Sequence, residues 1–268
     1  MMADAIDWIP LWAIFPATLA IILVSMELGF RFGRWRKSRK CDEREGPIGT
    51  MVGAMLALLG FILAFTFGLA SSQFESRRQV IVNEANAIGT AYLRVGLLAE
   101  PFSTASKLLL REYVDVRERD IDQRRLADAL ADSDRIHGLL WEQVEAATIA
   151  DPKPVPTGLF VTAINEVIDQ HSVRRLAGLN ARVPGIVWLV LLGLTTVSMG
   201  AVGYIIGIGE RSRSWASFGL AIAFSAVLHL VADIDRPSEG SLTSQRWAMR
   251  DLLRSMNTEL GPPRAPSP

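Results

Sequence analysis

The sequence predicts an all-α fold: a four-helix transmembrane protein with a helical-bundle insert between transmembrane helices 2 and 3. Half of the 268 residues are apolar and the mean hydropathy is +0.25, a combination that is uncommon in soluble domains of this size. Charged residues are nearly absent from four stretches and dense between them. No segment alternates polar and apolar residues as barrel strands do, so the membrane-crossing elements are expected to be helices.

The four uncharged stretches each reach the length of about 18–20 residues that a helix needs to cross a bilayer core. They predict transmembrane helices over residues 8–30, 46–74, 184–209 and 214–233. Asp4 and Asp7 precede the first stretch where a signal peptide would carry basic residues, so we interpret it as a retained anchor.

Residues 75–183 form the predicted insert. Helix 2 is expected to continue into it, because an apolar stripe steps by four and three residues through Ile81, Ala85, Ile88, Tyr92 and Val95. Further helices are predicted over 104–121, 125–147 and 159–182, with a proline-rich turn at 151–158. In the tail, residues 234–268, we expect a short amphipathic helix over 244–260 and then a disordered end.

Orientation is predicted from the loop at residues 31–45, which carries seven basic side chains. The positive-inside rule places this loop in the cytoplasm, and with it Cys41, the only cysteine. We interpret Cys41 as a bystander rather than a reactive thiol. In a bacterial inner membrane, the N-terminus and the insert would then lie outside.

The composition and motifs argue against several classes of function. A formal net charge of zero gives no indication of a nucleic-acid partner. No phosphate-binding loop, Gly-x-Ser-x-Gly or His-Glu-x-x-His motif is present, so we expect no enzymatic activity and no cofactor. His137, His171 and His229 are far apart in the sequence without ligand-like neighbours, so we expect no metal site there.

Polar residues at the membrane edge are candidates for function because burying them in lipid is costly. Glu27 could pair with Arg31 one helical turn away, and His229 is expected either to form a hydrogen bond with a facing helix or to relay protons. Asp233 and Asp235 could share a divalent cation if they lay on a loop, which would be the only support for an enzyme. The simpler interpretation is that they mark the end of helix 4.

Small residues recur at four-residue spacing in Gly49-x-x-x-Gly53-x-x-x-Ala57 and in Gly203-x-x-x-Gly207. Such spacing lets helices approach closely in lipid, either within one chain or between copies. On helix 2, a face that steps by four carries Ala57, Phe61, Phe65 and Leu69. In an oligomer this face would form a hydrophobic constriction whose ring edges tolerate an anion, whereas the alternative is packing within the chain.

Several motifs resemble the bestrophin-like domain family of bacterial membrane proteins. They are the run from Leu63 to Arg78, the run from Glu84 to Tyr92, Asn165-Glu-Val-Ile-Asp169 and Asp233-Ile-Asp-Arg-Pro237. The resemblance covers nearly the whole chain. Its matching residues, which are the family-motif candidates, are Phe74, Arg77, Arg78, Glu84, Asn86, Gly89, Tyr92, Asn165, Asp169, Arg236 and Pro237.

Ala64-Phe65 and the acidic-proline segment after helix 4 are more distantly similar to the bestrophin anion channels. That resemblance implies a homopentamer in the lipid bilayer, with helix 2 lining the pore and Phe61 and Phe65 at its neck. Ala57 departs from the pattern, since a third bulky neck residue would be expected there. The resemblance also implies a cytosolic insert, opposite to the orientation that the loop charges predict, and for orientation we follow the charges.

Two functions follow as hypotheses. The first is an oligomeric anion channel gated at a hydrophobic neck on helix 2. The second is a non-conducting membrane protein that senses or binds a partner through its insert, which makes up about two fifths of the chain.

Overall fold

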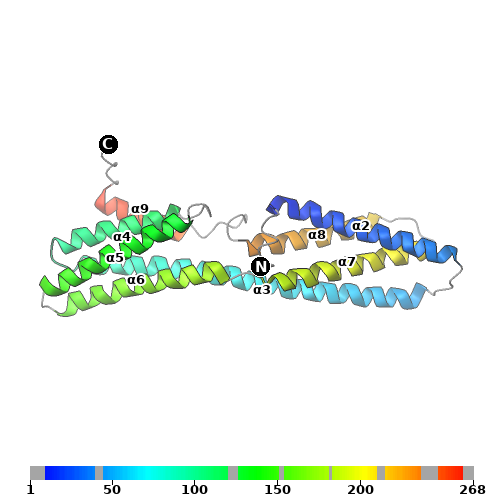
Figure 1. Ribbon diagram of the computed structural model, residues 1–268, viewed down its shortest axis with the longest axis horizontal. Helices are drawn as coiled ribbons and strands as arrows, with labels where there is room; N and C mark the ends of the chain where they lie inside the picture. Colours follow the sequence, from blue (N-terminus) through cyan, green and yellow to red (C-terminus); the bar gives the residue numbers. More distant parts are fainter. Residues whose placement is uncertain are drawn as a thin grey trace. The chain divides into compact units, whose positions relative to one another are not determined.

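The computed structural model describes residues 10–39, 45–119, 126–150, 154–180, 183–209, 215–236 and 247–261. All eight elements in these ranges are α-helices, so the prediction of an all-α fold is confirmed (Figure 1). The chain divides into two compact units. The membrane unit comprises Met1–Phe74 and Arg182–Leu242, and the insert unit comprises Glu75–Ala181 and Thr243–Pro268.

Four of the helices are long and apolar enough to cross a membrane. They are α2 (Leu11–Ser38), α3 (Glu45–Val95), α7 (Gly185–Ile208) and α8 (Trp215–Asp235). Helix α3 has 51 residues, far more than the roughly 20 that a bilayer core requires. Its uncharged part ends at Phe74, and the rest of the helix belongs to the insert unit.

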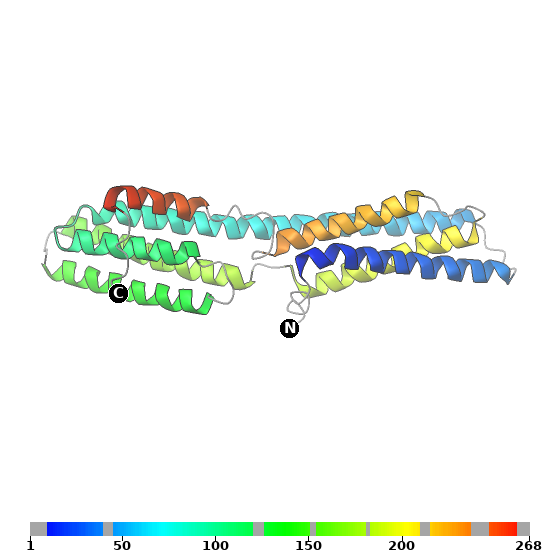
Figure 2. The same cartoon turned by 90° about the horizontal axis from the view of Figure 1, so that it is seen from above.

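The membrane unit packs α2, α7, α8 and the first part of α3 side by side (Figures 1 and 2). Its core contains Ile22, Leu59, Leu191, Met199 and Leu228. Glycines set the distance between α2 and α7. A Cβ atom built on Gly203 would clash with the Met26 carbonyl oxygen, and one built on Gly29 would clash with that of Gly200. Gly203-x-x-x-Gly207 therefore packs within the chain.

The insert unit is a helical bundle formed by the second part of α3 with α4 (Phe102–Arg119), α5 (Leu126–Ala150), α6 (Pro154–Asn180) and α9 (Trp247–Leu260). All five residues of the predicted α3 stripe are buried in its core. Met249 and Met256 of α9 join the same core, so the C-terminal helix completes this bundle.

Two predicted boundaries are wrong. Helix α2 continues through residues 31–38, which were predicted to form a loop, because Arg and Lys are good helix formers and favour the last turn of a helix. Helix α6 begins at Pro154, within the predicted turn at 151–158. Proline is tolerated there because the first turn of a helix needs no backbone N–H donors.

Candidate functional site

The first candidate site is the uncovered face of α3 within the membrane unit. One side of the helix is buried through Leu59, Leu63, Thr66 and Ala70. On the opposite side Ala57 is exposed, and Phe61 and Phe65 are each 67% exposed. Leu69, the fourth predicted member of this face, is half-buried and packs against the core, so it lies at the edge.

Small residues run along one side of this uncovered face. A Cβ built on Gly53, Gly60 or Gly68 would meet no atom of another helix within 4 Å, so no other helix in the described part of the chain covers them. At about 100° per residue, Ala57 and Ala64 fall on the same line, and Phe61 and Phe65 border it on one side. The face is therefore an apolar strip of small residues with two phenylalanine rings along one side.

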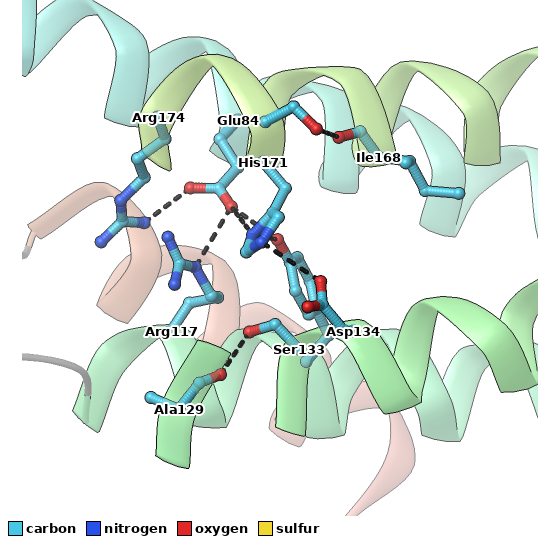
Figure 3. A network of polar contacts seen from close by, with 10 residues as sticks. Glu84, Arg117, Ala129, Ser133, Asp134, Ile168, His171 and Arg174 are labelled. Atoms are coloured by element: carbon cyan, nitrogen blue, oxygen red, sulfur yellow. Dashed lines mark hydrogen bonds and ion pairs between the residues drawn. The ribbon is translucent and has the colours of Figure 1, made fainter. Parts of the chain in front are cut away.

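The second candidate site is a buried polar network in the insert unit, with Glu84 of α3 at its centre. Glu84 is 0% exposed and forms an ion pair with Arg117 of α4, whose Nε lies 3.2 Å from Oε1. Arg174 of α6 donates to Oε2 at 2.6 Å. Both guanidinium groups point toward the carboxylate in Figure 3.

Tyr113 and His171 extend the network from α4 and α6. The Tyr113 hydroxyl donates to Glu84 Oε1 at 2.6 Å and lies 3.1 Å from Nδ1 of His171. His137 of α5 packs against both rings, with centroid distances of 4.8 Å to Tyr113 and 4.9 Å to His171. Four helices therefore meet at one cluster of polar side chains.

Burial and neighbouring charges perturb the pKa values in this network. Burial alone would raise the pKa of Glu84, but the charges of Arg174 and Arg117 outweigh it and lower the pKa below the usual value. Burial and the neighbouring Glu84 raise the pKa of Tyr113 well above its usual value. Burial lowers the pKa of His171, and burial with the nearby His171 lowers that of His137 to about 4. At neutral pH, Glu84 is therefore charged and both histidines are neutral.

The membrane-edge candidates lie apart from this network. Glu27 accepts a hydrogen bond from Arg31 Nε at 2.8 Å, as the four-residue spacing predicted. His229 packs edge-on against Phe15 of α2 at 6.2 Å, and its buried Nδ1 has no hydrogen-bond partner among the described residues. The predicted hydrogen bond to a facing helix is therefore not formed at this nitrogen.

Asp233 and Asp235 are buried in the last turn of α8 rather than on a loop. Asp235 Oδ1 accepts a hydrogen bond at 2.8 Å from the backbone N–H of Val183, which lies just before α7. This contact fixes the start of α7 to the end of α8. Arg236 is buried beside them, and Pro237 lies outside the described residues.

The remaining family-motif residues fall into buried and exposed groups. Arg77 and Tyr92 are buried, Phe74 packs against the membrane-unit core, and a Cβ on Gly89 would contact Leu252 of α9. Asn86, Asn165 and Asp169 are exposed, and Arg78 is half-buried and pairs with Glu75 at 3.4 Å.

The proximity of His137 and His171 was missed from the sequence, and the expectation that the histidines are isolated is wrong for this pair. A signal existed in the apolar periodicity. His171 lies four residues after the buried Val167, and Glu84 lies four residues before the buried Ile88. A polar side chain on an apolar stripe predicts a buried polar partner on another helix.

These features define a class: an all-α membrane protein with four membrane-crossing helices and a bundle built around a buried carboxylate. The chain belongs to the Bestrophin-like domain family, whose model matches residues 19–246. No curated protein matches the sequence.

Solved structures share this fold at low sequence identity. A crystal structure of a membrane protein aligns with a TM-score of 0.65 and 14% identity, covering 94% of this chain and 99% of that one. A variant of a bacterial bestrophin homologue from Klebsiella pneumoniae aligns with a TM-score of 0.64, also at 14% identity and over 94% and 99% of the two chains. A second variant of that homologue has a TM-score of 0.60 at 13% identity, covering 92% and 98%. At this identity the likeness establishes the fold.

Proposed function

We propose that several copies of this chain assemble into an ion channel in the bacterial cell membrane, with α3 lining the pore. The observation that carries this proposal is the uncovered face of α3. One side of α3 is buried, and the other exposes two phenylalanines beside a line of small residues. Such a surface is suited to pack against helices of other copies. Membership of the Bestrophin-like family supports an assembly of this kind.

Lipid contact alone does not explain that face. Other membrane-crossing helices expose large side chains to the bilayer, among them Trp12, Leu28, Ile186 and Trp215. The uncovered face of α3 also carries Gly53, Gly60 and Gly68, which offer lipid little contact. Small residues become useful when another backbone approaches, because close approach maximises van der Waals contact.

The chemistry of the pore surface favours anions. Copies of α3 around an axis would present Phe61 and Phe65 as hydrophobic rings that exclude water from a narrow neck. The edge of an aromatic ring is electropositive, so it tolerates an anion better than a cation. A pentamer is the assembly that the resemblance to bestrophin anion channels implies.

The first test is the mass of the full chain in mild detergent, measured by light scattering together with single-particle imaging. We expect a symmetric oligomer with a central axis, and a pentamer would match the resemblance. A monomer or dimer would overturn the pore and favour a non-conducting protein that acts through its insert.

The second test is anion flux in liposomes for the wild type and for Phe61→Ala and Phe65→Ala. Widening the neck should change chloride flux by several-fold. Phe218→Ala is the matched control, because Phe218 is 43% exposed on α8, away from the proposed pore. Absence of flux in all four proteins, or an equal response to Phe218→Ala, would contradict the proposal.

A further inference from the structure

Two buried histidines in the insert unit each carry a ring nitrogen without a partner. His137 of α5 is 7% exposed and His171 of α6 is 3% exposed, and their rings are nearly perpendicular at 83°. Nε2 of each ring is buried and has no hydrogen-bond partner among the described residues. Leaving a buried polar atom unpaired costs about 1–3 kcal/mol, so two such atoms in one cluster need an explanation.

The hydrogen-bond chain from Glu84 fixes the tautomer of His171. Because the Glu84 carboxylate can only accept, the Tyr113 hydroxyl donates its proton to it. The Tyr113 oxygen must then accept from His171, whose Nδ1 lies 3.1 Å away and therefore carries the ring proton. Nε2 of His171 is left as an unprotonated nitrogen with a free lone pair.

A carboxylate faces this lone pair. Asp134 Oδ1 lies 3.8 Å from Nε2 of His171, and the Asp134 side chain is exposed to solvent (Figure 3). Asp134 precedes His137 by three residues on α5, so the two side chains share one face of the helix. One ligand atom from each of Asp134, His137 and His171 lies within 4.8 Å of the other two. Asp134 Oδ1 and Nε2 of His171 are both lone-pair donors to a metal, so a cation between them would bind to both.

We propose that Asp134, His137 and His171 bind a divalent transition-metal ion, with Zn²⁺ the best match to the ligands. Two imidazoles and one carboxylate are typical zinc ligands, whereas Mg²⁺ and Ca²⁺ prefer oxygen ligands alone. The exposed side of Asp134 leaves room for water as a fourth ligand. The site is independent of whether the protein conducts ions.

The surroundings of the site fit a bound metal. Nδ1–H of His171 donates to the Tyr113 oxygen, and this is the outer hydrogen bond that orients a ligating histidine. Zinc ligands lie about 2.0–2.2 Å from the metal, so the three ligand atoms must move inward by about 1 Å. Binding would therefore fasten α5 to α6.

The experiment is a Zn²⁺ titration of the full chain in detergent, after removal of any affinity tag and treatment with a chelator. Calorimetry gives the dissociation constant, and elemental analysis after desalting gives the stoichiometry. We expect one zinc ion per chain, with a raised unfolding temperature, and no comparable binding of Mg²⁺.

Variants locate the site. Asp134→Asn changes an exposed side chain, so the protein should fold and lose at least about 10-fold in zinc affinity. His137→Gln and His171→Gln should lose more. Tyr113→Phe, which removes the outer hydrogen bond to His171 together with the hydrogen bond to Glu84, should lose about 10-fold. Asp132→Asn, at an exposed position on the same helix, is the matched control, and Cys41→Ser excludes a contribution from the only thiol.

Two results would overturn the proposal. One is an absence of zinc binding by the chelator-treated wild type. The other is zinc binding that Asp134→Asn weakens no more than Asp132→Asn does, which would mean that the ion is adventitious. Asp134→Asn changes an exposed side chain and leaves the core intact. The comparison with Asp132→Asn therefore still tests the zinc site if a histidine variant misfolds.

Discussion

In the membrane unit, α2 and α7 approach each other through glycines, whereas in the insert unit four helices meet around the buried carboxylate of Glu84. The difference is the one expected if the insert unit lies in water, as the sequence predicts. In lipid, burying apolar side chains gives little advantage, so helices associate by close backbone contact. In water, hydrophobic burial drives folding, and large residues such as Phe160, Ile164 and Leu110 are buried in the core of the insert unit.

The comparison also shows where each unit is vulnerable. Close packing at Gly203 leaves no room for added atoms, so the membrane unit is sensitive to larger side chains. The insert unit is sensitive to loss of charge, because each partner of Glu84 is expensive to bury alone. The three predictions below test these two sensitivities and the assignment of the insert to one side of the membrane.

The largest expected effect is all-or-none and concerns the side of the membrane that the insert unit faces. The loop charges place Cys41 in the cytoplasm and the insert outside. A membrane-impermeant maleimide should therefore leave Cys41 unlabelled in spheroplasts and label it after permeabilisation. Cys41 is the only cysteine, so the native sequence serves as the probe and Cys41→Ser as the blank. Labelling of intact spheroplasts would instead favour the cytosolic insert that the bestrophin resemblance implies.

The next largest effect is expected for Glu84→Gln. This change keeps the shape of the side chain but leaves Arg117 and Arg174 without their shared carboxylate in the core. Breaking a buried ion pair from one side costs about 3–5 kcal/mol, so the unfolding temperature should fall sharply when followed by circular dichroism.

Glu75→Gln is the matched control on the same helix. Glu75 pairs with Arg78 at 3.4 Å, but both side chains are exposed, and such pairs contribute about 0–1 kcal/mol. Equal effects of the two substitutions would mean that the Glu84 network does not stabilise the insert unit.

The two units also differ in how far the sequence predicts them. The membrane-crossing helices are identifiable because length and lack of charge are properties of one continuous segment. The α3 stripe through Ile81, Ile88 and Val95 is predictable for a similar reason, since periodicity shows which face of a single helix is buried. Both predictions are confirmed.

The contacts between helices are not predictable in this way. His137 and His171 meet because α5 and α6 pack in one particular register, and periodicity gives the face of each helix but not its register against another. The start of α6 was also missed, because Pro154 and Pro156 were interpreted by composition rather than by their place in a first helical turn. The glycine motifs at Gly49 and Gly203 have the same spacing, and that spacing does not show which of them packs against another helix of the chain.

The smallest expected effect compares two of those glycines. Gly203→Ala would press a methyl group against the Met26 carbonyl group, which costs about 1–3 kcal/mol when a packed core is overfilled. Gly53→Ala adds the same methyl group where no other helix in the described part of the chain comes within 4 Å, so the fold of one chain should be unaffected. Thermal unfolding in detergent should therefore show a lower midpoint for Gly203→Ala alone. If Gly53→Ala weakens the oligomer measured by light scattering, the uncovered face of α3 is a contact between copies. An unchanged unfolding midpoint for Gly203→Ala would refute the close packing of α2 on α7.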